Sequence, residues 1–246
     1  MICETINKIF LSTARKAGWR TIKMKLKNDY NIIMNHKRIR RLMKKYNLIT
    51  IIRRAKPYAK MLRANHEHKT LPNLLKRKFK QEQFQKVFLK DITYLYYNNG
   101  QRVYLSAVKD VASKEIVAYH LSRGLDMSIV FKTLDRLENN IQMDYKLETI
   151  IHSDQGFHYT NSDFQLRVKE LELIQSMSRK GNCLDNAPME SFLGHMKDEM
   201  EYAEALSFNE LERIVDDYMN YYNRFRYQWG LNKMSPAQYR THILVA

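Results

Sequence analysis

The chain has 246 residues, 44% hydrophobic and 28% charged, so it is long enough to bury a core in one large domain or two smaller ones. It has no apolar run long enough to span a membrane, and its two cysteines are too few for a disulfide framework. The small number of cysteines predicts a reducing compartment, and the first residues lack the apolar core and cleavage site of a secretory signal.

The net charge of +16 is concentrated at one end of the chain. Residues 1–86 contain 24 Lys and Arg against 4 Asp and Glu, whereas residues 87–246 contain 18 against 22. A basic arm beside a slightly acidic body predicts a polyanionic partner. The alternative is a solvated basic surface with no specific partner.

Residues 17–48 are expected to form two helices joined by a turn. Trp19, Ile22 and Leu26 recur at helical spacing in the first helix, and Asn35 is a good N-cap for the second. The outer face of the second helix carries His36, Lys37, Arg40, Arg41, Lys44 and Lys45. This pattern fits the recognition helix of a helix-turn-helix that contacts DNA, or otherwise an ordinary amphipathic surface helix.

Residues 51–84 are rich in Lys and Arg and contain Pro57 and Pro72 without a sustained period, which indicates a basic linker. The segment HEH at 66–68 has two histidines but no nearby cysteine pair. Solvated histidines are therefore favoured over a zinc site.

Beyond the linker, the hydrophobic pattern predicts a sheet with helices on its faces. An antiparallel meander is expected from a strand that begins at Lys86 and from strands at 102–111 and 115–122. The later elements alternate between helix (127–140, 162–172, 186–201) and strand (147–154, 173–178), with a last helix at 207–225. Ser207 and Glu210 have the spacing of a capping box at the start of that helix.

Three acidic residues occupy different elements of this predicted sheet. Asp91 lies mid-strand, Asp154 follows a strand before Gln155-Gly156, and Glu190 lies in a helix, with thirty-five residues between it and Asp154. An ionised carboxylate within a buried strand is costly without a compensating cation, and Mg²⁺ prefers oxygen ligands of this type. Lys197, two helical turns after Glu190, is placed to meet a phosphate near such a site. A cap, turn or solvated charge is the alternative for any one of the acids, as for Asp110 at a strand end and Asp185 at a helix start.

The segments DITY, HSDQGFHYTN and SRKGNCLDNAPMESF around the three acids resemble those of OrfB-type insertion-sequence transposases. That family belongs to the DDE superfamily, which includes retroviral integrases. The segment YYNRFRYQWGLNKMSPAQY is similar to the family's C-terminal box, and residues 18–49 resemble its helix-turn-helix. The resemblance covers roughly residues 17–240, and the acidic signature is its most specific part.

The resemblance implies an α/β, ribonuclease H-like fold with a mixed five-stranded sheet flanked by helices. The implied organisation is a helix-turn-helix domain (1–50), a basic linker (51–84), an integrase catalytic core (85–205) and a C-terminal helical extension (206–246). Asp91, Asp154 and Glu190 carry over as ligands of two Mg²⁺ or Mn²⁺ ions. Lys197 carries over as a contact to terminal DNA, and Asn182 and Asn186 as residues that shape the site.

The family cuts double-stranded DNA at element ends and joins the freed 3′ hydroxyl to target DNA, so a homo-multimer on DNA is expected. An upstream-frame fusion partner and a location on the bacterial nucleoid in the cytoplasm are also implied. Phe88 stands where the family often has Trp, His158 where Gln is common, and no zinc module is visible. The rival functions are a catalytically inactive DNA-binding regulator, a nuclease acting on RNA in hybrids, and a degenerate scaffold.

Overall fold

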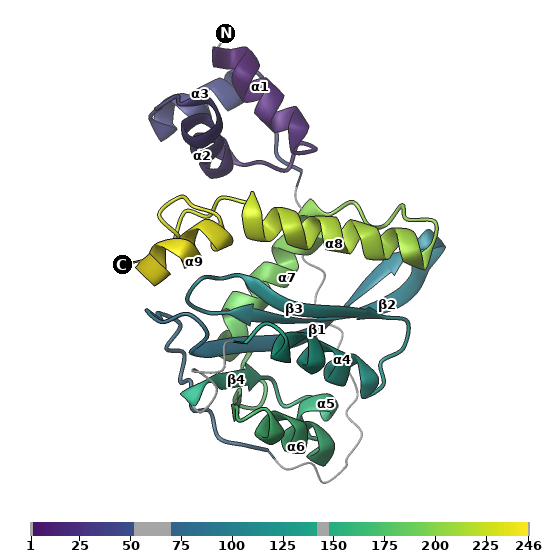
Figure 1. Cartoon of the computed structure of the whole chain (residues 1–246). Helices are drawn as coiled ribbons and strands as arrows, with labels where there is room; N and C mark the ends of the chain where they lie inside the picture. The colour runs from purple at the N-terminus through teal and green to yellow at the C-terminus, as the bar shows by residue number, and fades with distance from the viewer. Residues whose placement is uncertain (1, 52–69, 142–147, 246) are drawn as a thin grey trace.

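The computed structural model describes residues 2–51, 70–141 and 148–245. It consists of an N-terminal helical arm, a central sheet and a set of helices on both faces of the sheet (Figure 1). The HEH segment and most of the proposed linker lie outside the described residues. Within the described ranges, no helix combines the length and apolarity needed to cross a lipid bilayer.

The arm contains α1 (Ile2–Ser12), α2 (Trp19–Tyr30) and α3 (His36–Lys45) around a small apolar core. The predicted pair of helices is confirmed as α2 and α3, and α1 is an additional helix that packs Ile6 and Phe10 into the same core. Asn35 caps α3 as expected, because its side chain accepts a hydrogen bond from the backbone N–H of Lys37. The arm is therefore a three-helix unit with its own interior.

The sheet has the strand order β3-β2-β1-β4-β5 and is mixed. The antiparallel meander consists of β1 (Val87–Tyr97), β2 (Gln101–Asp110) and β3 (Ile116–Ser122). Two short strands, β4 (Ile150–Ser153) and β5 (Ile174–Met177), run parallel to β1 on its other side. The expected ribonuclease H-like, five-stranded mixed sheet is confirmed.

Helices cover both faces of this sheet (Figure 1). One face packs against α4 (Ser128–Glu138), α5 (Phe157–Thr160) and α6 (Ser162–Glu170), and its core includes Phe88, Val108 and Phe164. The other face packs against α7 (Ala187–Glu199) and α8 (Phe208–Arg224), and its core includes Leu89 and Phe192. Because β1 has neighbours on both faces, its residues 87–90 are all buried.

The chain ends in α9 (Pro236–Val245), which contacts α8. The loop between these two helices also holds the N-terminal arm: Asn28 donates to the carbonyl of Lys233, and the Tyr227 hydroxyl donates to Asp29. The ring centroids of Trp19 and Trp229 lie 6.4 Å apart. Arm and C-terminal segment therefore share polar and aromatic contacts.

Candidate active site

Asp91 lies in the middle of β1, directly after the buried run 87–90. Lys90 before it is fully buried, and its ammonium group donates to the Ser106 hydroxyl at 3.0 Å. Asp91 itself is half-buried, and its Oδ1 accepts a hydrogen bond of 2.8 Å from the N–H of Ile92. Burial raises the pKa of the Asp91 carboxyl to about 7, and the negative charges of Asp154 and Glu190 act in the same direction.

Asp154 follows β4, which is the parallel neighbour of β1. Its side chain is exposed, and Oδ1 accepts a hydrogen bond of 2.8 Å from the N–H of Gly156. An added Cβ at Gly156 would lie 2.9 Å from Asp154 Oδ1, so a larger residue at this position would displace the carboxylate oxygen. The backbone of Gly156 is extended and suits any residue. The contact therefore fixes the direction of the carboxylate.

Glu190 occupies the first turn of α7, after Pro188 at the helix start. The opposite side of the helix is packed, since Phe192 and Met196 are buried as the sequence predicts. Burial and the charge of Asp154 raise the pKa of the exposed Glu190 carboxyl. Lys197, in the last turn of α7, favours the ionised form of Asp91 and thus lowers its pKa. All three acids therefore influence one another electrostatically, with Lys197 within the same field.

The residues present suit a divalent cation. Asp91, Asp154 and Glu190 come from separate elements, and the charge of Asp154 raises the pKa of both Asp91 and Glu190, a repulsion that a hard cation would relieve. Among the described residues, however, no three acidic, His or Cys side chains stand close enough together to hold one ion. Asp91 and Asp154 instead accept hydrogen bonds from backbone N–H groups one and two residues ahead. The three acids therefore share one electrostatic environment without forming a closed set of ligands.

Buried polar groups support the strand ends behind the acids. His152, on β4, is fully buried between the hydroxyls of Ser176 at 2.8 Å and Ser178 at 3.1 Å. Burial lowers the pKa of His152 to about 4, so the imidazole is neutral at pH 7. Asn186, expected to shape the site, is buried and donates to the carbonyl of Lys90 at 3.4 Å. Each of these contacts ties β1 or β4 to the elements that follow.

Asp185 has a role that the sequence did not reveal. It precedes α7 as predicted, but its carboxylate is fully buried and accepts hydrogen bonds from the side chains of Asn73, Arg77 and Arg179. These donors, Arg179 foremost, hold the pKa of Asp185 well below its usual range. Asn182 also accepts from Arg77 at 2.9 Å. The cluster fastens residues 73–77 to the loop that leads into the Glu190 helix.

Asp110 is structural, as the sequence predicts. It ends β2, is fully buried, and accepts hydrogen bonds from the N–H of Gln85 and from the N–H and hydroxyl of Ser113. Asp110 lies at the end of β2 that is far from the β1–β2 turn, and there it holds the backbone at Gln85, just before β1 begins. Burial raises the pKa of this carboxyl despite the hydrogen bonds.

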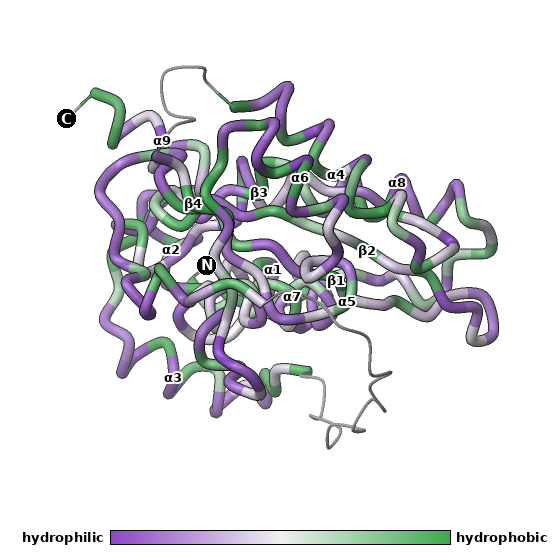
Figure 2. Tube along the Cα trace, turned by 90° about the horizontal axis from the view of Figure 1, so that it is seen from below, coloured by the Kyte–Doolittle hydropathy of each residue, from purple (hydrophilic) through white to green (hydrophobic). Residues whose placement is uncertain are grey.

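The basic face of α3 is largely exposed, as expected for a DNA-binding helix. Lys37, Arg40, Arg41 and Lys44 are all exposed. Figure 2 shows α3 at the periphery of the molecule, with a trace that is hydrophilic over most of its length. His36 differs from the other predicted contacts because it is half-buried, with its ring centroid 5.5 Å from that of Trp19.

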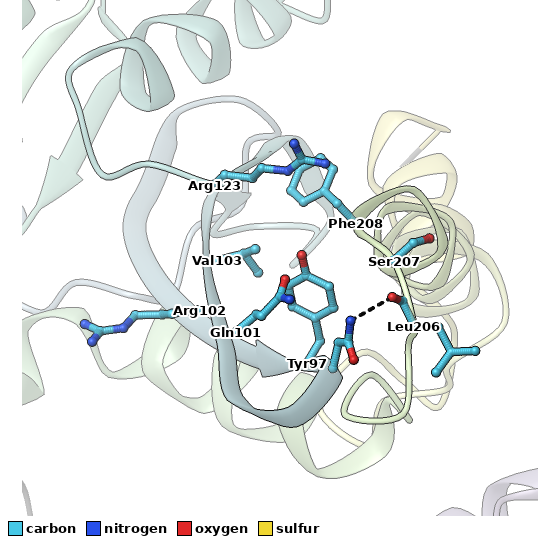
Figure 3. A pocket seen from close by; sticks show the side chains of 9 residues that line it. Tyr97, Gln101, Arg102, Val103, Arg123, Leu206, Ser207 and Phe208 are labelled. Atoms are coloured by element: carbon cyan, nitrogen blue, oxygen red, sulfur yellow. Dashed lines mark hydrogen bonds between the residues drawn. The ribbon is translucent and has the colours of Figure 1, made fainter.

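A hollow of about 620 Å³ is separate from the acids. It lies between the β1–β2 turn and the start of α8, and Figure 3 shows Arg123 against the Phe208 ring at its edge, 4.6 Å from the ring centroid. Asn98 closes one side by donating to the carbonyl of Leu206. No acidic residue lines this hollow, so the chemistry of a metal site belongs to the carboxylates and not here.

Models of known protein families match most of the chain. Residues 83–183 and 190–244 each match an integrase core domain, and residues 2–56 match an HTH-like domain. The chain is 34% identical over 238 residues to the putative transposase InsK for insertion sequence element IS150 of Escherichia coli, covering 96% of this chain and 82% of that protein. It is also 34% identical over 222 residues to an uncharacterized transposase-like protein of Haemophilus influenzae, covering 90% and 100%.

A third relative is the transposase for insertion sequence element IS904 of Lactococcus lactis, 30% identical over 98% of this chain and 94% of that protein. Among solved structures, the magnesium complex of the HTLV-2 integrase catalytic core domain is 13% identical with a TM-score of 0.49. That similarity covers 63% of this chain and 96% of the integrase chain.

Proposed function

Because this chain belongs to the insertion-sequence transposases that carry an integrase core domain, we propose that it cuts DNA at element ends and joins the 3′ hydroxyl to target DNA. The observation that carries the proposal is that Asp91 lies on β1, while Asp154 follows the paired strand β4 and Glu190 lies on α7, which packs on β1. The three carboxylates, from β1, the end of β4 and α7, are the kind of oxygen ligands that Mg²⁺ or Mn²⁺ prefers.

In this proposal Asp91, Asp154 and Glu190 hold two divalent ions. When bound, such ions activate the attacking oxygen and stabilise the leaving oxygen of a phosphodiester. Asp91 is the least mobile of the three because it is half-buried within a strand, while the exposed Asp154 and Glu190 adjust their rotamers. Burial of Lys90 and His152 keeps water away from the back of the site.

The basic groups position the DNA. Lys197 neutralises a phosphate beside the acids, and Asn182 and Asn186 shape the loop before α7. The exposed cations of α3, with His36 at its start, bind duplex DNA mainly through phosphates, so affinity falls with salt. The arm (1–50), linker (51–84), core (85–205) and extension (206–246) divide these tasks, and a multimer brings two DNA ends together.

The test is a cleavage and joining assay on duplexes made from the DNA that flanks the coding sequence. Asp91→Asn, Asp154→Asn and Glu190→Gln should each abolish both steps in Mg²⁺ or Mn²⁺ while leaving duplex binding within about twofold of wild type. Asp163→Asn, at an exposed acid in the first turn of α6, is the matched control and should cut normally. Full activity in any of the three variants would refute the assignment.

A second candidate is a DNA-binding regulator without catalytic activity. The observation that favours it is that, within the described chain, no three acidic, His or Cys side chains lie close enough together to bind one metal ion. The same assay separates the two functions. A regulator would bind the flanking DNA tightly yet leave it uncut at every concentration of Mg²⁺ or Mn²⁺.

A further inference from the structure

Two tyrosines on β1 are unusually exposed for aromatic residues in a central strand. Tyr94 and Tyr96 are 51% and 46% exposed, and their ring centroids lie 5.4 Å apart at an interplanar angle of 66°. In the described chain, β4 pairs with β1 only at residues 87–89, so the outer half of β1 is paired with β2 alone. The two rings therefore stand beside an open strand edge.

Cationic side chains accompany both rings. The Lys197 ammonium lies 4.7 Å from the centroid of the Tyr94 ring, and the Arg102 guanidinium lies 5.8 Å from that of Tyr96. Arg102 is the cross-strand partner of Tyr96, so the two share a face of the hairpin. Arg102 also lines the edge of the hollow beside α8, and Figure 3 shows its guanidinium directed away from the middle of that hollow.

The tyrosine pair adjoins the carboxylates. Tyr94 lies three residues beyond Asp91, roughly 10 Å along the strand, and this odd spacing directs the two side chains to opposite faces of β1 beside its open edge. Lys197 connects the two, because it acts on Asp91 electrostatically and covers the Tyr94 ring. A ligand that contacts both tyrosines therefore reaches the neighbourhood of the acids.

We propose that Tyr94 and Tyr96 form a stacking platform for an unpaired DNA base beside the three carboxylates. The inference rests on the proposed function and names a part of the DNA that the site would hold. Flat aromatic faces next to cations match the flat bases and anionic backbone of single-stranded DNA. A base within an intact duplex cannot present its face, because both faces are stacked, so the base on the platform must have left the helix.

The test compares two short duplexes that differ only in a single-stranded extension, one of thymidines and one of abasic nucleotides. Both carry the same phosphates, so the ratio of their dissociation constants reports base stacking alone. Affinities are measured by fluorescence anisotropy in EDTA, which prevents cleavage. Wild type should bind the thymidine form roughly 5- to 100-fold more tightly.

Tyr94→Leu and Tyr96→Leu remove the aromatic faces but keep bulky apolar side chains. Each should bring the ratio of the two dissociation constants close to one, whereas Tyr94→Phe should keep the wild-type ratio. Tyr30→Leu, at an exposed tyrosine that ends α2, is the matched control and should also keep it. Photocrosslinking of the wild-type protein to an extension that contains 5-iodouracil should label Tyr94 or Tyr96. This experiment does not depend on the folding of any variant.

The outcomes separate this inference from the proposed function. Duplex binding with a ratio near one in wild type, or leucine variants with the wild-type ratio, would overturn the platform alone. Crosslinks confined to other residues would do the same. A protein that binds neither DNA would overturn the proposed function and the platform with it.

Discussion

Replacing Gly156 by alanine should separate catalysis from stability. An added Cβ would lie 2.9 Å from Asp154 Oδ1, whereas ordinary contact begins at 3.4 Å, so the oxygen must retreat by roughly 0.5 Å. The backbone at Gly156 has φ −65° and ψ 158°, which alanine adopts without strain. The exposed Asp154 carboxylate moves easily, so alanine should change the position of this carboxylate and leave the stability of the fold almost unchanged.

The expected loss of strand-cutting rate is roughly 10- to 100-fold, because displacements of this size disrupt a catalytic geometry. The free energy of unfolding should change by less than about 1 kcal/mol, the usual effect of alanine at a helix N-cap. Gly18→Ala is a matched control, since Gly18 is also an N-cap with extended backbone, and a Cβ there meets nothing within 4 Å.

The assays are single-turnover cleavage in Mg²⁺ and urea unfolding of the metal-free protein. Gly18→Ala should show the same small change in stability with wild-type cleavage. Cleavage by Gly156→Ala at the wild-type rate would refute the reasoning, because the observed direction of Asp154 would then be irrelevant to catalysis. A large fall in stability would equally contradict it.

Three further predictions concern charge. Asp185→Asn should lower the free energy of unfolding by about 2 kcal/mol at pH 7, since the two arginines it leaves are partly exposed and can be hydrated. The pKa of Asp185 is depressed in the fold, so this stabilisation exists above the unfolded pKa near 4 and is lost below it, and urea unfolding at pH 3 should show a smaller difference. Asp91→Asn should stabilise the metal-free protein by about 1–4 kcal/mol above pH 7, because the raised pKa makes ionisation of Asp91 costly there. In calorimetry, this gain in the free energy of unfolding should shrink as the pH falls through 7 and vanish below about pH 4. Lys37→Ala and Arg41→Ala should each reduce the slope of log affinity against log salt by about 0.9 in DNA titrations.

Each of these charge predictions has a contradictory result. An equal effect of Asp185→Asn at pH 3 and pH 7 would show that its charge contributes nothing. Loss of stability in Asp91→Asn at pH 8 would mean that the carboxylate is not strained by burial. An unchanged salt slope in both arm variants would exclude α3 from the phosphate contacts.

The sequence predicted the elements that carry the acids because each had a strong local signal. The run around Asp91 is apolar on both faces, as expected of a strand with helices on either side, and Asn35 marked the start of α3. α1 was overlooked although Ile2, Ile6 and Ile9 recur at helical spacing. α5 was missed because a single helical turn is too short to show a period.

Other parts of the site depend on contacts that no local pattern encodes. Asp185 pairs with Arg77, which lies 108 positions earlier, and the sequence gives no sign that the two meet. The same holds for Trp19 and Trp229, which join the arm to the C-terminal loop. Spacing could place three acids on neighbouring elements, but side-chain rotamers depend on local hydrogen bonds such as that from Gly156 to Asp154.

The most direct test of the central claim is localised cleavage of the protein itself. Fe²⁺ in place of Mg²⁺, with ascorbate and peroxide, generates radicals that cut the backbone near a bound ion. The account predicts cuts around residues 91, 154 and 190 together, suppressed by excess Mg²⁺ and lost in Asp91→Asn. Cuts at one of these positions without the other two, or scattered along the chain, would contradict a shared metal site.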